Sequence, residues 1–241
     1  MVVSRRLVVG LVAACALAAG WYGRGALAPK GDEGFDPSTL ARSTHDAFAQ
    51  IYRERLWGTN NAGAGTSGGG STLGATMLWR MYLQRFMADN HVHSVVDAGC
   101  GDWEFSRVID WTGIDYKGFD IVDDVIAEDK RRYEAPNIHF FQGNIVETDL
   151  PRADLLIVKH VLQHIPNADV AKFATQFHKY KYVLVVDGVD STSLSAVNSD
   201  TRPGGYRELD LTAPPFGLRG TKVLTYLGDD SSMHQVLEIA N

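Results

Sequence analysis

Residues 95–103 read VVDAGCGDW, and this stretch decides the fold. The apolar run over 94–98 is typical of a buried β-strand. Gly99 and Gly101 follow at once, and because glycine has no side chain, the backbone there can turn tightly and approach a ligand closely. Asp97 places a carboxylate at the end of the strand, where open α/β sheets bind their ligands. The stretch therefore predicts a first strand followed by a ligand-binding turn.

Short apolar runs alternate with helical patterns on both sides of this stretch. We expect further strands at 116–122, 138–142, 154–158, 182–186, 222–227 and 234–239, the last two joined by a hairpin-type connection. Helices are expected at 37–56, 73–90, 105–111, 123–133 and 169–180, with a glycine-rich loop over 60–74. Continuous apolar strands separated by helices indicate a parallel sheet covered on both faces. The predicted fold class is α/β: a Rossmann-like, doubly wound, seven-stranded, mostly parallel sheet with a C-terminal antiparallel hairpin, preceded by an N-terminal apolar helix.

The N-terminal segment is almost uniformly apolar over residues 7–22, LVVGLVAACALAAGWY, and follows Arg5 and Arg6. Its length is near the lower limit for a membrane-spanning helix. We expect a single-pass membrane anchor. The alternatives are a cleaved secretory signal ending at Ala26-Leu27-Ala28, a mitochondrial presequence, or a lipoprotein-type box at residues 12–15.

Charge and composition exclude several classes of protein. Hydrophobic residues make up 45% and charged residues 22% of the 241 residues, as in globular proteins. The net charge is −6, and residues 32–241 alone carry 19 basic and 29 acidic residues. Because residues 32–241 carry this excess of acidic residues, they have no long-range attraction to a phosphate backbone. We therefore expect no nucleic-acid partner. Two cysteines in 241 residues exclude a disulfide scaffold.

A second carboxylate, Asp120, stands nineteen residues after Gly101 at the end of the second predicted strand. A carboxylate at this place can accept hydrogen bonds from both hydroxyls of a ribose. A dinucleotide site would have a third glycine where this chain has Glu104, and two acids beside the loop would repel a pyrophosphate. They suit a nucleoside ligand with a positive charge, and S-adenosylmethionine has a ribose, an adenine, a sulfonium and an amine.

With these features the sequence resembles the class I S-adenosylmethionine-dependent methyltransferases over residues 73–241. More narrowly, LWG at 56–58, DAGCGDW at 97–103 and GGYRELDLTAPPF at 204–216 are similar to a group of small bacterial-type methyltransferases. We therefore divide the chain into an anchor or signal segment at 1–28, a linker, helix and glycine-rich loop at 29–72, and a methyltransferase domain at 73–241.

The resemblance implies cofactor contacts from three consecutive strand ends: Asp97, Gly99 and Gly101 toward the methionine part, Asp120 toward the ribose, and Ile121 and Asn144 toward the adenine. Asp102, beside Gly101, is a further expected cofactor contact. Asn144 stands where the family often has an acid. Its side-chain oxygen can accept the same hydrogen bond from the adenine amino group. Asn also commonly caps a turn, so this second role stays open.

Two histidines follow the fourth predicted strand in residues 159–166, KHVLQHIP. We expect His160, nearer the strand end, to be catalytic, because an ordinary pKa of about 6.5 suits removal of a proton from a substrate hydroxyl or amine. His164 is expected to pack beneath the strand. On a helix the two rings would share a face and could bind a metal, but the sequence offers no third ligand, so no metal is expected.

A polar stretch of about thirty residues separates the fifth predicted strand from the sixth, and loops of this length in compact domains are commonly functional. Its residues Asp187, Arg202, Tyr206 and Arg207 are the candidate substrate contacts. The arginines could pair with an anionic group, and Asp187 could bind a metal or an amine.

The sequence thus predicts an enzyme that transfers a methyl group from S-adenosylmethionine to an oxygen or nitrogen atom of a small molecule by in-line displacement. Two other functions stay open: a membrane-tethered nucleoside-cofactor-binding module without turnover, and a nucleotide-cofactor oxidoreductase. An anchor with Arg5 and Arg6 on the cytoplasmic side would place residues 29–241 across the membrane, away from the cytosolic cofactor. Either Arg24 and Lys30 help to invert this topology, or the compartment is an organelle, or the chain is not a methyltransferase.

Overall fold

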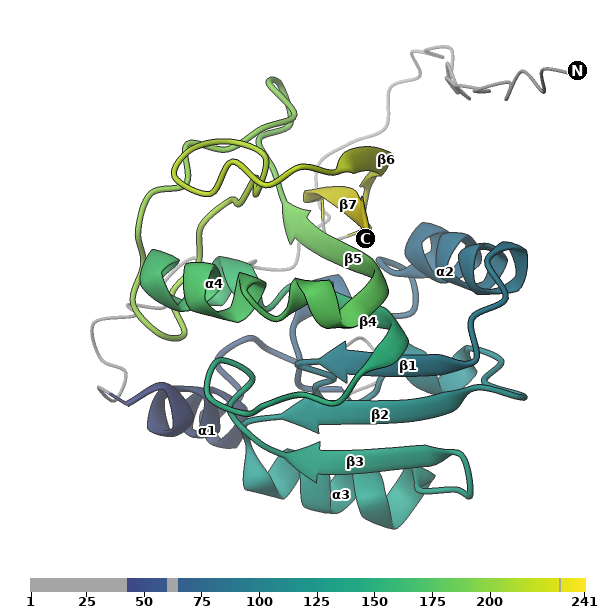
Figure 1. The fold of residues 1–241 in the computed structure, drawn as a ribbon. Helices are drawn as coiled ribbons and strands as arrows, with labels where there is room; N and C mark the ends of the chain where they lie inside the picture. The colour runs from purple at the N-terminus through teal and green to yellow at the C-terminus, as the bar shows by residue number, and fades with distance from the viewer. Residues whose placement is uncertain (1–42, 60–64, 230) are drawn as a thin grey trace, which may run out of the picture. The chain divides into compact units, whose positions relative to one another are not determined.

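The computed structural model describes residues 43–59, 65–229 and 231–241, which form one seven-stranded sheet in the order β3-β2-β1-β4-β5-β7-β6 (Figure 1). Strands β1 to β5 pair in parallel, and β7 runs antiparallel between β5 and β6. The strands are β1 Ser94–Ala98, β2 Asp115–Asp120, β3 Ile138–Gln142, β4 Ala153–Lys159, β5 Tyr180–Gly188, β6 Thr221–Leu227 and β7 Met233–Ala240. The predicted sheet and its closing hairpin are confirmed. The predicted apolar N-terminal helix lies outside the described residues.

The helices agree with the sequence patterns in part. They are α1 Thr44–Glu54, α2 Met77–Asp89, α3 Asp123–Tyr133 and α4 Asn167–Ala174. Helix α1 begins where the side chain of Ser43 accepts a hydrogen bond from the Asp46 N–H, and it ends at Arg55 in the left-handed conformation. Helix α2 begins four residues later than predicted, because residues 72–76 form a turn instead.

Two predicted helices are corrected by the structure. Residues 105–111 hold only a 3₁₀ turn, η3 (Ser106–Val108), because the chain becomes extended at Ile109. Trp103 and Trp111 on either side of this turn pack against each other with ring centroids 6.5 Å apart, and this aromatic contact replaces a regular helix. The predicted helix at 169–180 stops at Ala174, since a second 3₁₀ turn leads directly into β5.

Side chains alternate between the two faces of the sheet, and each face has its own hydrophobic core. One core joins the sheet to α1 and α4, and the other joins it to α2 and the η3 segment (Figure 1). Val96 points into the first core and Val95 into the second. The same alternation turns Asp97 toward the α2 side and Asp187 toward the α1 and α4 side. Polar groups at the strand ends are therefore divided between two faces.

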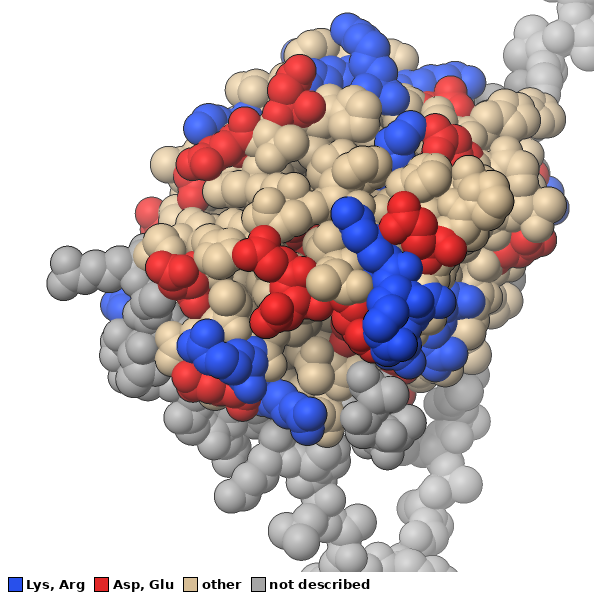
Figure 2. All heavy atoms as spheres, turned by 90° about the horizontal axis from the view of Figure 1, so that it is seen from below, with Lys and Arg blue, Asp and Glu red and all other residues tan. Residues whose placement is uncertain are grey.

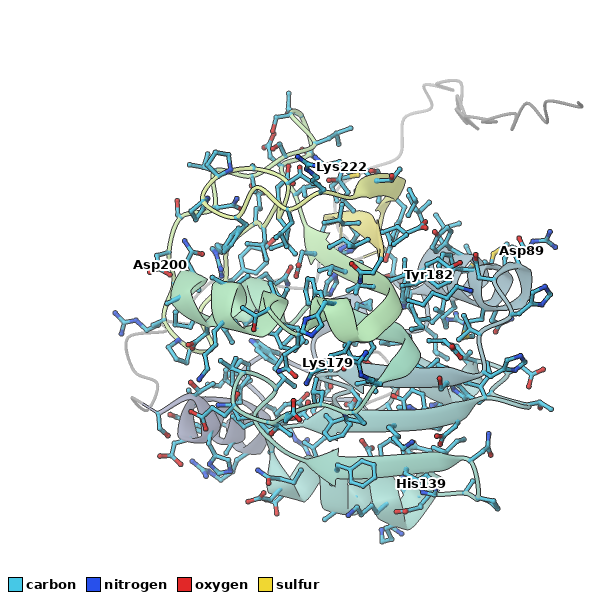
Figure 3. The ribbon with its side chains drawn as sticks, viewed as in Figure 1. Asp89, His139, Lys179, Tyr182, Asp200 and Lys222 are labelled. Atoms are coloured by element: carbon cyan, nitrogen blue, oxygen red, sulfur yellow. The ribbon has the colours of Figure 1, made fainter. Side chains whose placement is uncertain are left out.

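The long segment 189–220 between β5 and β6 is held by polar side chains at both ends. The carboxylate of Asp200, labelled beside α4 in Figure 3, accepts a hydrogen bond from the first N–H of that helix, at Asn167, over 2.8 Å. The ammonium of Lys222, labelled near the hairpin, lies 2.8 Å from Asp210 Oδ2. The segment that contains the candidate substrate residues Arg202, Tyr206 and Arg207 is thus fastened to helix α4 and to strand β6.

Charges of both signs are mixed on the face seen from below in Figure 2, which includes α3. This helix has Asp123 and Asp124 in its first turn and basic residues 130–132 in its last turn. Both ends complement the helix dipole. Among the helices of the described residues, none is long and apolar enough to span a membrane.

Candidate functional site

The candidate site lies along the edge of the sheet where the parallel strands β1, β2, β4 and β5 end. The turn after β1 requires glycine at two positions. Gly99 has φ +85°, and an added Cβ would lie 2.2 Å from the Val161 side chain. Gly101 has φ +57°, and an added Cβ would lie 2.6 Å from Ser67 Oγ. Both positions therefore exclude other residues for conformational and steric reasons together.

Asp120 closes this turn from the end of β2. Its Oδ2 accepts the Gly101 N–H over 3.1 Å, and its Oδ1 accepts the Val122 N–H over 3.0 Å. Burial raises the pKa of Asp120 to about 6, and the backbone hydrogen bonds oppose this rise. A carboxylate has about four lone-pair positions. Asp120 thus keeps acceptor capacity on both oxygens for a pair of ligand hydroxyls.

Asp97 points to the α2 side of the sheet and is 3% exposed. Its Oδ2 accepts a hydrogen bond from the Tyr116 hydroxyl over 2.8 Å. Burial raises the pKa of Asp97 to about 7, although the Tyr116 bond and the nearby charge of Lys159 lower it. Asp97 is therefore a buried acid with a raised pKa, placed directly before the glycine turn.

Asp102 binds the glycine-rich loop. Its Oδ2 accepts the N–H groups of Thr66 and Ser67, and its Oδ1 accepts the N–H of Glu104. Ser67 Oγ in turn accepts the Asp102 N–H and lies 2.8 Å from the Tyr52 hydroxyl. The described part of the loop lies directly on the turn after β1, so Asp102 has a positioning role toward the loop beside its predicted role toward the cofactor.

The end of β4 holds Lys159 and His160. Lys159 Nζ lies 2.7 Å from the carbonyl oxygen of Gly70 in the glycine-rich loop and 3.2 Å from His160 Nδ1. His160 Nε2 lies 3.0 Å from Nδ1 of His234 at the start of β7. Burial lowers the pKa of His160 well below its ordinary value, and the charge of Lys159 adds to this. His160 thus lies between two basic side chains, with one contact to each ring nitrogen.

His164 does not share a helical face with His160, because the chain between them forms only the 3₁₀ turn η4 (Leu162–His164). Its Nδ1 donates to the carbonyl oxygen of Gly205 over 2.8 Å, and its ring centroid lies 4.9 Å from that of Trp57. Burial lowers the pKa of His164 to about 4. Across residues 43–59, 65–229 and 231–241, no three His, Cys, Asp or Glu side chains are placed to hold a metal ion.

Asn144, after β3, caps its own turn. Its Oδ1 accepts the Val146 N–H over 3.0 Å, and its carbonyl oxygen accepts the Thr148 N–H. This is the second of the two roles that the sequence left open, and one lone pair of the Asn144 side chain is used in it. Ile121, half-buried at the end of β2, packs against the core on the α1 and α4 side. Its role toward an adenine stays a prediction.

The candidate substrate residues occupy quite different surroundings. Asp187 is 4% exposed, and neither carboxylate oxygen has a hydrogen-bond partner among the described residues. Burial raises the pKa of Asp187 to about 8, against the opposing charge of Arg207. A cavity of about 10 Å³, lined by Val185, Asp187, Leu209, Asp210, Leu211, Gln235 and Leu237, lies beside it. That volume is close to the minimum for one water molecule.

Arg207 is buried and donates to the Leu162 carbonyl oxygen and to Asn167 Oδ1, so its Nη groups brace the segment 189–220 against α4. Tyr206 is 54% exposed, and its hydroxyl lies over Gly188 at the end of β5. Arg202 is exposed. Of these three, the structure brings only Tyr206 and Arg207 to the edge of the sheet beside Asp187.

Sequence reasoning missed Thr66, Ser67, Lys159 and His234. One signal was available for Lys159, because a lysine that ends an apolar strand must either leave the sheet or be buried with partners. For Thr66 and Ser67, the only signal in the sequence was the glycine-rich loop that contains them. His234 pairs with Gly188 across two strands, so its place depends on long-range register that local sequence does not show.

Comparison with known proteins agrees with this architecture. Residues 95–181 match the protein family described as "Methyltransferase domain". No curated protein matches the sequence. The N-methyltransferase NodS from Bradyrhizobium japonicum WM9, solved with S-adenosyl-L-homocysteine, covers 80% of this chain and 98% of its own, with 10% identity and a TM-score of 0.58.

Magnesium protoporphyrin IX methyltransferase (ChlM) from Synechocystis PCC 6803, also solved with bound S-adenosyl-L-homocysteine, covers 68% of this chain and 82% of its own, with 14% identity and a TM-score of 0.51. The methyltransferase domain of bacterial CtHen1 covers 46% of this chain at 20% identity, and its TM-score of 0.41 adds nothing to the fold assignment. This chain spans 64% of the length of that domain. The strand order, the glycine turn after β1 and the family match over residues 95–181 together identify the fold as that of a methyltransferase domain.

Proposed function

We propose that this chain is an S-adenosylmethionine-dependent methyltransferase that methylates an oxygen or nitrogen atom of a small molecule. The observation that carries the proposal is Asp120, which is fixed by the Gly101 and Val122 N–H groups and keeps acceptor positions for two ribose hydroxyls. The two neighbours above that contain S-adenosyl-L-homocysteine, with TM-scores of 0.58 and 0.51, support the same cofactor.

The residues present fit this cofactor. Gly99 and Gly101 give the turn its left-handed conformation, and Asp97 and Asp120 supply negative charge beside it. The cofactor would bring an activated methyl group on a sulfonium. The chain would then act mainly by alignment: the glycine-rich loop, fixed through Asp102 and Lys159, would hold the ligand and exclude water from the strand ends.

We place the acceptor substrate on the Tyr206 side of the site. The exposed Tyr206 ring lies 5.9 Å from the His164 ring, which in turn stacks at a tilt on Trp57. Asp187, next to Gly188 beneath the Tyr206 hydroxyl, would accept a hydrogen bond from a substrate amine or hydroxyl. This arrangement suits a small molecule with an apolar surface and one such donor.

The test is calorimetric titration of the full chain, kept in a mild detergent, with S-adenosylmethionine and separately with NADH. We expect micromolar binding of S-adenosylmethionine that Asp120→Ala removes. The matched control is Asp124→Ala, an exposed acid in the first turn of α3, four residues after Asp120. Binding of NADH instead would favour an oxidoreductase. No binding to folded wild-type protein would overturn the proposal.

A binding-positive protein is then incubated with methyl-labelled S-adenosylmethionine and a panel of small amines, alcohols and phenols. Transfer of label supports the enzyme, whereas binding without transfer favours a module without turnover.

We also propose that residues 7–22, which lie outside the described residues, attach the chain to a membrane. Reporter fusions at both ends test that attachment and its topology.

A further inference from the structure

Three basic side chains, Lys159, His160 and His234, contact one another in series across the ends of β4, β5 and β7. Lys159 Nζ contacts His160 Nδ1 over 3.2 Å, and His160 Nε2 contacts His234 Nδ1 over 3.0 Å. The two rings are tilted by 34° with centroids 4.7 Å apart. His160 adopts φ +54°, a conformation that non-glycine residues take rarely and that often marks a local constraint.

The chemistry of the lysine sets the direction of these hydrogen bonds. An ammonium group donates hydrogen bonds and accepts none. Lys159 Nζ is a donor here, because its second contact is the Gly70 carbonyl oxygen at 2.7 Å, which can only accept. His160 Nδ1 must therefore be the acceptor of the Lys159 hydrogen bond. In a neutral imidazole the proton is then on the other nitrogen, so His160 Nε2 donates to His234 Nδ1.

We propose that Lys159 and His234 are positioning residues that lock His160 in its neutral, Nε2-protonated form, so that His160 is a link in the site and not its general base. Both of its nitrogens are used in this arrangement, Nδ1 as acceptor and Nε2 as donor. His160 then has no lone pair to offer to a substrate proton. These contacts instead connect the glycine-rich loop, through Gly70 and Lys159, to the closing hairpin at His234.

Burial supports the neutral state of the ring. Lys159 is 6% and His234 2% exposed, and the titratable groups that face His160 are Lys159, His234 and His164. All three are basic, so each lowers the pKa of His160. A proton added to His160 would leave Nδ1 as a second donor facing the Lys159 ammonium, which breaks the hydrogen bond and places two cations 3.2 Å apart.

Long-range nitrogen NMR spectra of the ¹⁵N-labelled full chain test the proton positions directly, without any cofactor or substrate. We expect His160 and His234 to show a protonated Nε2 and an unprotonated Nδ1, with signals assigned by His160→Gln and His234→Gln. A proton on His160 Nδ1, or rapid exchange between both forms, would overturn the proposal. Lys159→Met should release His160 into such exchange, whereas Lys172→Met, an exposed lysine of α4, should leave it unchanged.

A matched pair of variants separates positioning from proton transfer, and this arm rests on the proposed function. Glutamine offers one acceptor and one donor, as the locked ring does, but it is no base. His160→Gln should bind S-adenosylmethionine within about threefold of wild type and retain most of kcat, whereas His160→Leu should bind at least about tenfold more weakly. A large loss of kcat in His160→Gln with unchanged affinity would contradict the proposal. If the wild type binds no S-adenosylmethionine, only the proposed function fails, and the NMR result still decides the inference.

Discussion

Ser67 and Asp102 exchange hydrogen bonds in both directions: the Ser67 N–H donates to Asp102 Oδ2, and the Asp102 N–H donates to Ser67 Oγ. The two residues are 35 positions apart in the sequence. Because the pair joins the glycine-rich loop to the turn after β1, it fixes the position of the loop relative to the ends of the strands. The Thr66 N–H adds a further bond to the same carboxylate oxygen.

We predict that Asp102→Ala releases this loop while the sheet stays folded. The variant removes the acceptor for three N–H groups, of which two belong to the loop. Hydrogen exchange at Thr66 and Ser67 should accelerate by about tenfold or more, as expected for loss of hydrogen bonds to a charged acceptor. Exchange in β1 and β4 should stay slow.

The matched control is Asp110→Ala, which removes an exposed carboxylate whose hydrogen bonds come from Thr112 in a local turn. It should leave the exchange of the loop unchanged. The double variant Ser67→Ala/Asp102→Ala should show coupling of about 0.5–3 kcal/mol in unfolding free energy. Additive effects would mean that the reciprocal pair does not act as a unit.

The buried carboxyl group of Asp187 should make the free energy of unfolding depend on pH. Burial raises its pKa from the ordinary value of 3.8 to about 8. A raised pKa means that the folded protein keeps a proton which the unfolded chain has lost, so stability is highest at low pH and falls as pH rises to about 8. Asp187→Asn mimics the protonated form and should be more stable than wild type at pH 9. The difference should shrink toward pH 5, by up to about 1.4 kcal/mol per pH unit.

Urea unfolding of wild type and variant at pH 5, 7 and 9 measures this difference. Because Asp97 and Asp129 also have raised pKa values, only the difference between the two proteins isolates Asp187. Asp190→Asn is the control, since hydrogen bonds from Ser193 and Thr192 lower the pKa of this exposed group. Its effect should not change between pH 7 and pH 9. Equal effects of both variants at pH 9 would show that the pKa of Asp187 is not raised in the folded protein.

The sequence was most informative where local pattern and burial agree. β1 and β3 begin and end at the predicted residues, because turn residues bound both apolar runs. β1 is buried from its second residue onward, whereas in the edge strand β3 only Phe140 is buried. Asp120 was predicted at the end of a strand, and the structure places it there, in hydrogen-bond contact with Gly101. The helix predicted at 105–111 was wrong, because the aromatic packing of Trp103 and Trp111 is a tertiary interaction that helical spacing does not reveal.

The contacts of the candidate site could not be predicted in the same way. Asp102 was assigned to the cofactor side, but its carboxylate also binds a loop 35 residues earlier. His160 was selected for its ordinary pKa, whereas the partners that set its protonation are its neighbour Lys159 and the distant His234. These pairings depend on sheet register and loop placement. Residue type and strand-end position therefore predict where a site lies, and long-range contacts decide which atoms are available in it.

Gly118 in the middle of β2 tests how tightly the turn after β1 is packed. A Cβ at this position would lie 2.9 Å from Cys100 Sγ and 3.1 Å from Phe140 Cδ1. Both neighbours are buried, so Gly118→Ala should destabilise the protein by about 1–3 kcal/mol through overpacking. For a chain of this size the midpoint of thermal unfolding should fall by about 2–4 °C per kcal/mol.

Cys100→Ala provides the internal control, because it removes the sulfur that the new methyl group would meet. The double variant Cys100→Ala/Gly118→Ala should be more stable than the sum of the two single effects predicts. If the two effects simply add, the cost of Gly118→Ala comes from Phe140 or from the backbone, and the turn has room beside Cys100.

Asp210 predicts the opposite pH dependence from Asp187. Burial would raise its pKa, but hydrogen bonds from Lys222, Thr212 and Ser195 lower it to about 2. A lowered pKa means that the ion contributes stability which is complete above its ordinary pKa of 3.8 and is lost as pH falls toward about 2. Asp210→Asn should therefore destabilise the protein at pH 7, by about 2 kcal/mol for a buried, charge-assisted network.

The Asp210 carboxylate is also the anchor of the segment 189–220, because Ser195 Oγ and Lys222 Nζ meet at its Oδ2 over 2.7 and 2.8 Å. The effect of Asp210→Asn on urea unfolding should diminish between pH 5 and pH 2.5, as the wild-type unfolded chain takes up the proton. Hydrogen exchange should rise in residues 190–215 and stay slow in β1 and β2. An effect of equal size at both pH values would show that the carboxylate acts through its shape and neutral hydrogen bonds, and that its charge contributes nothing.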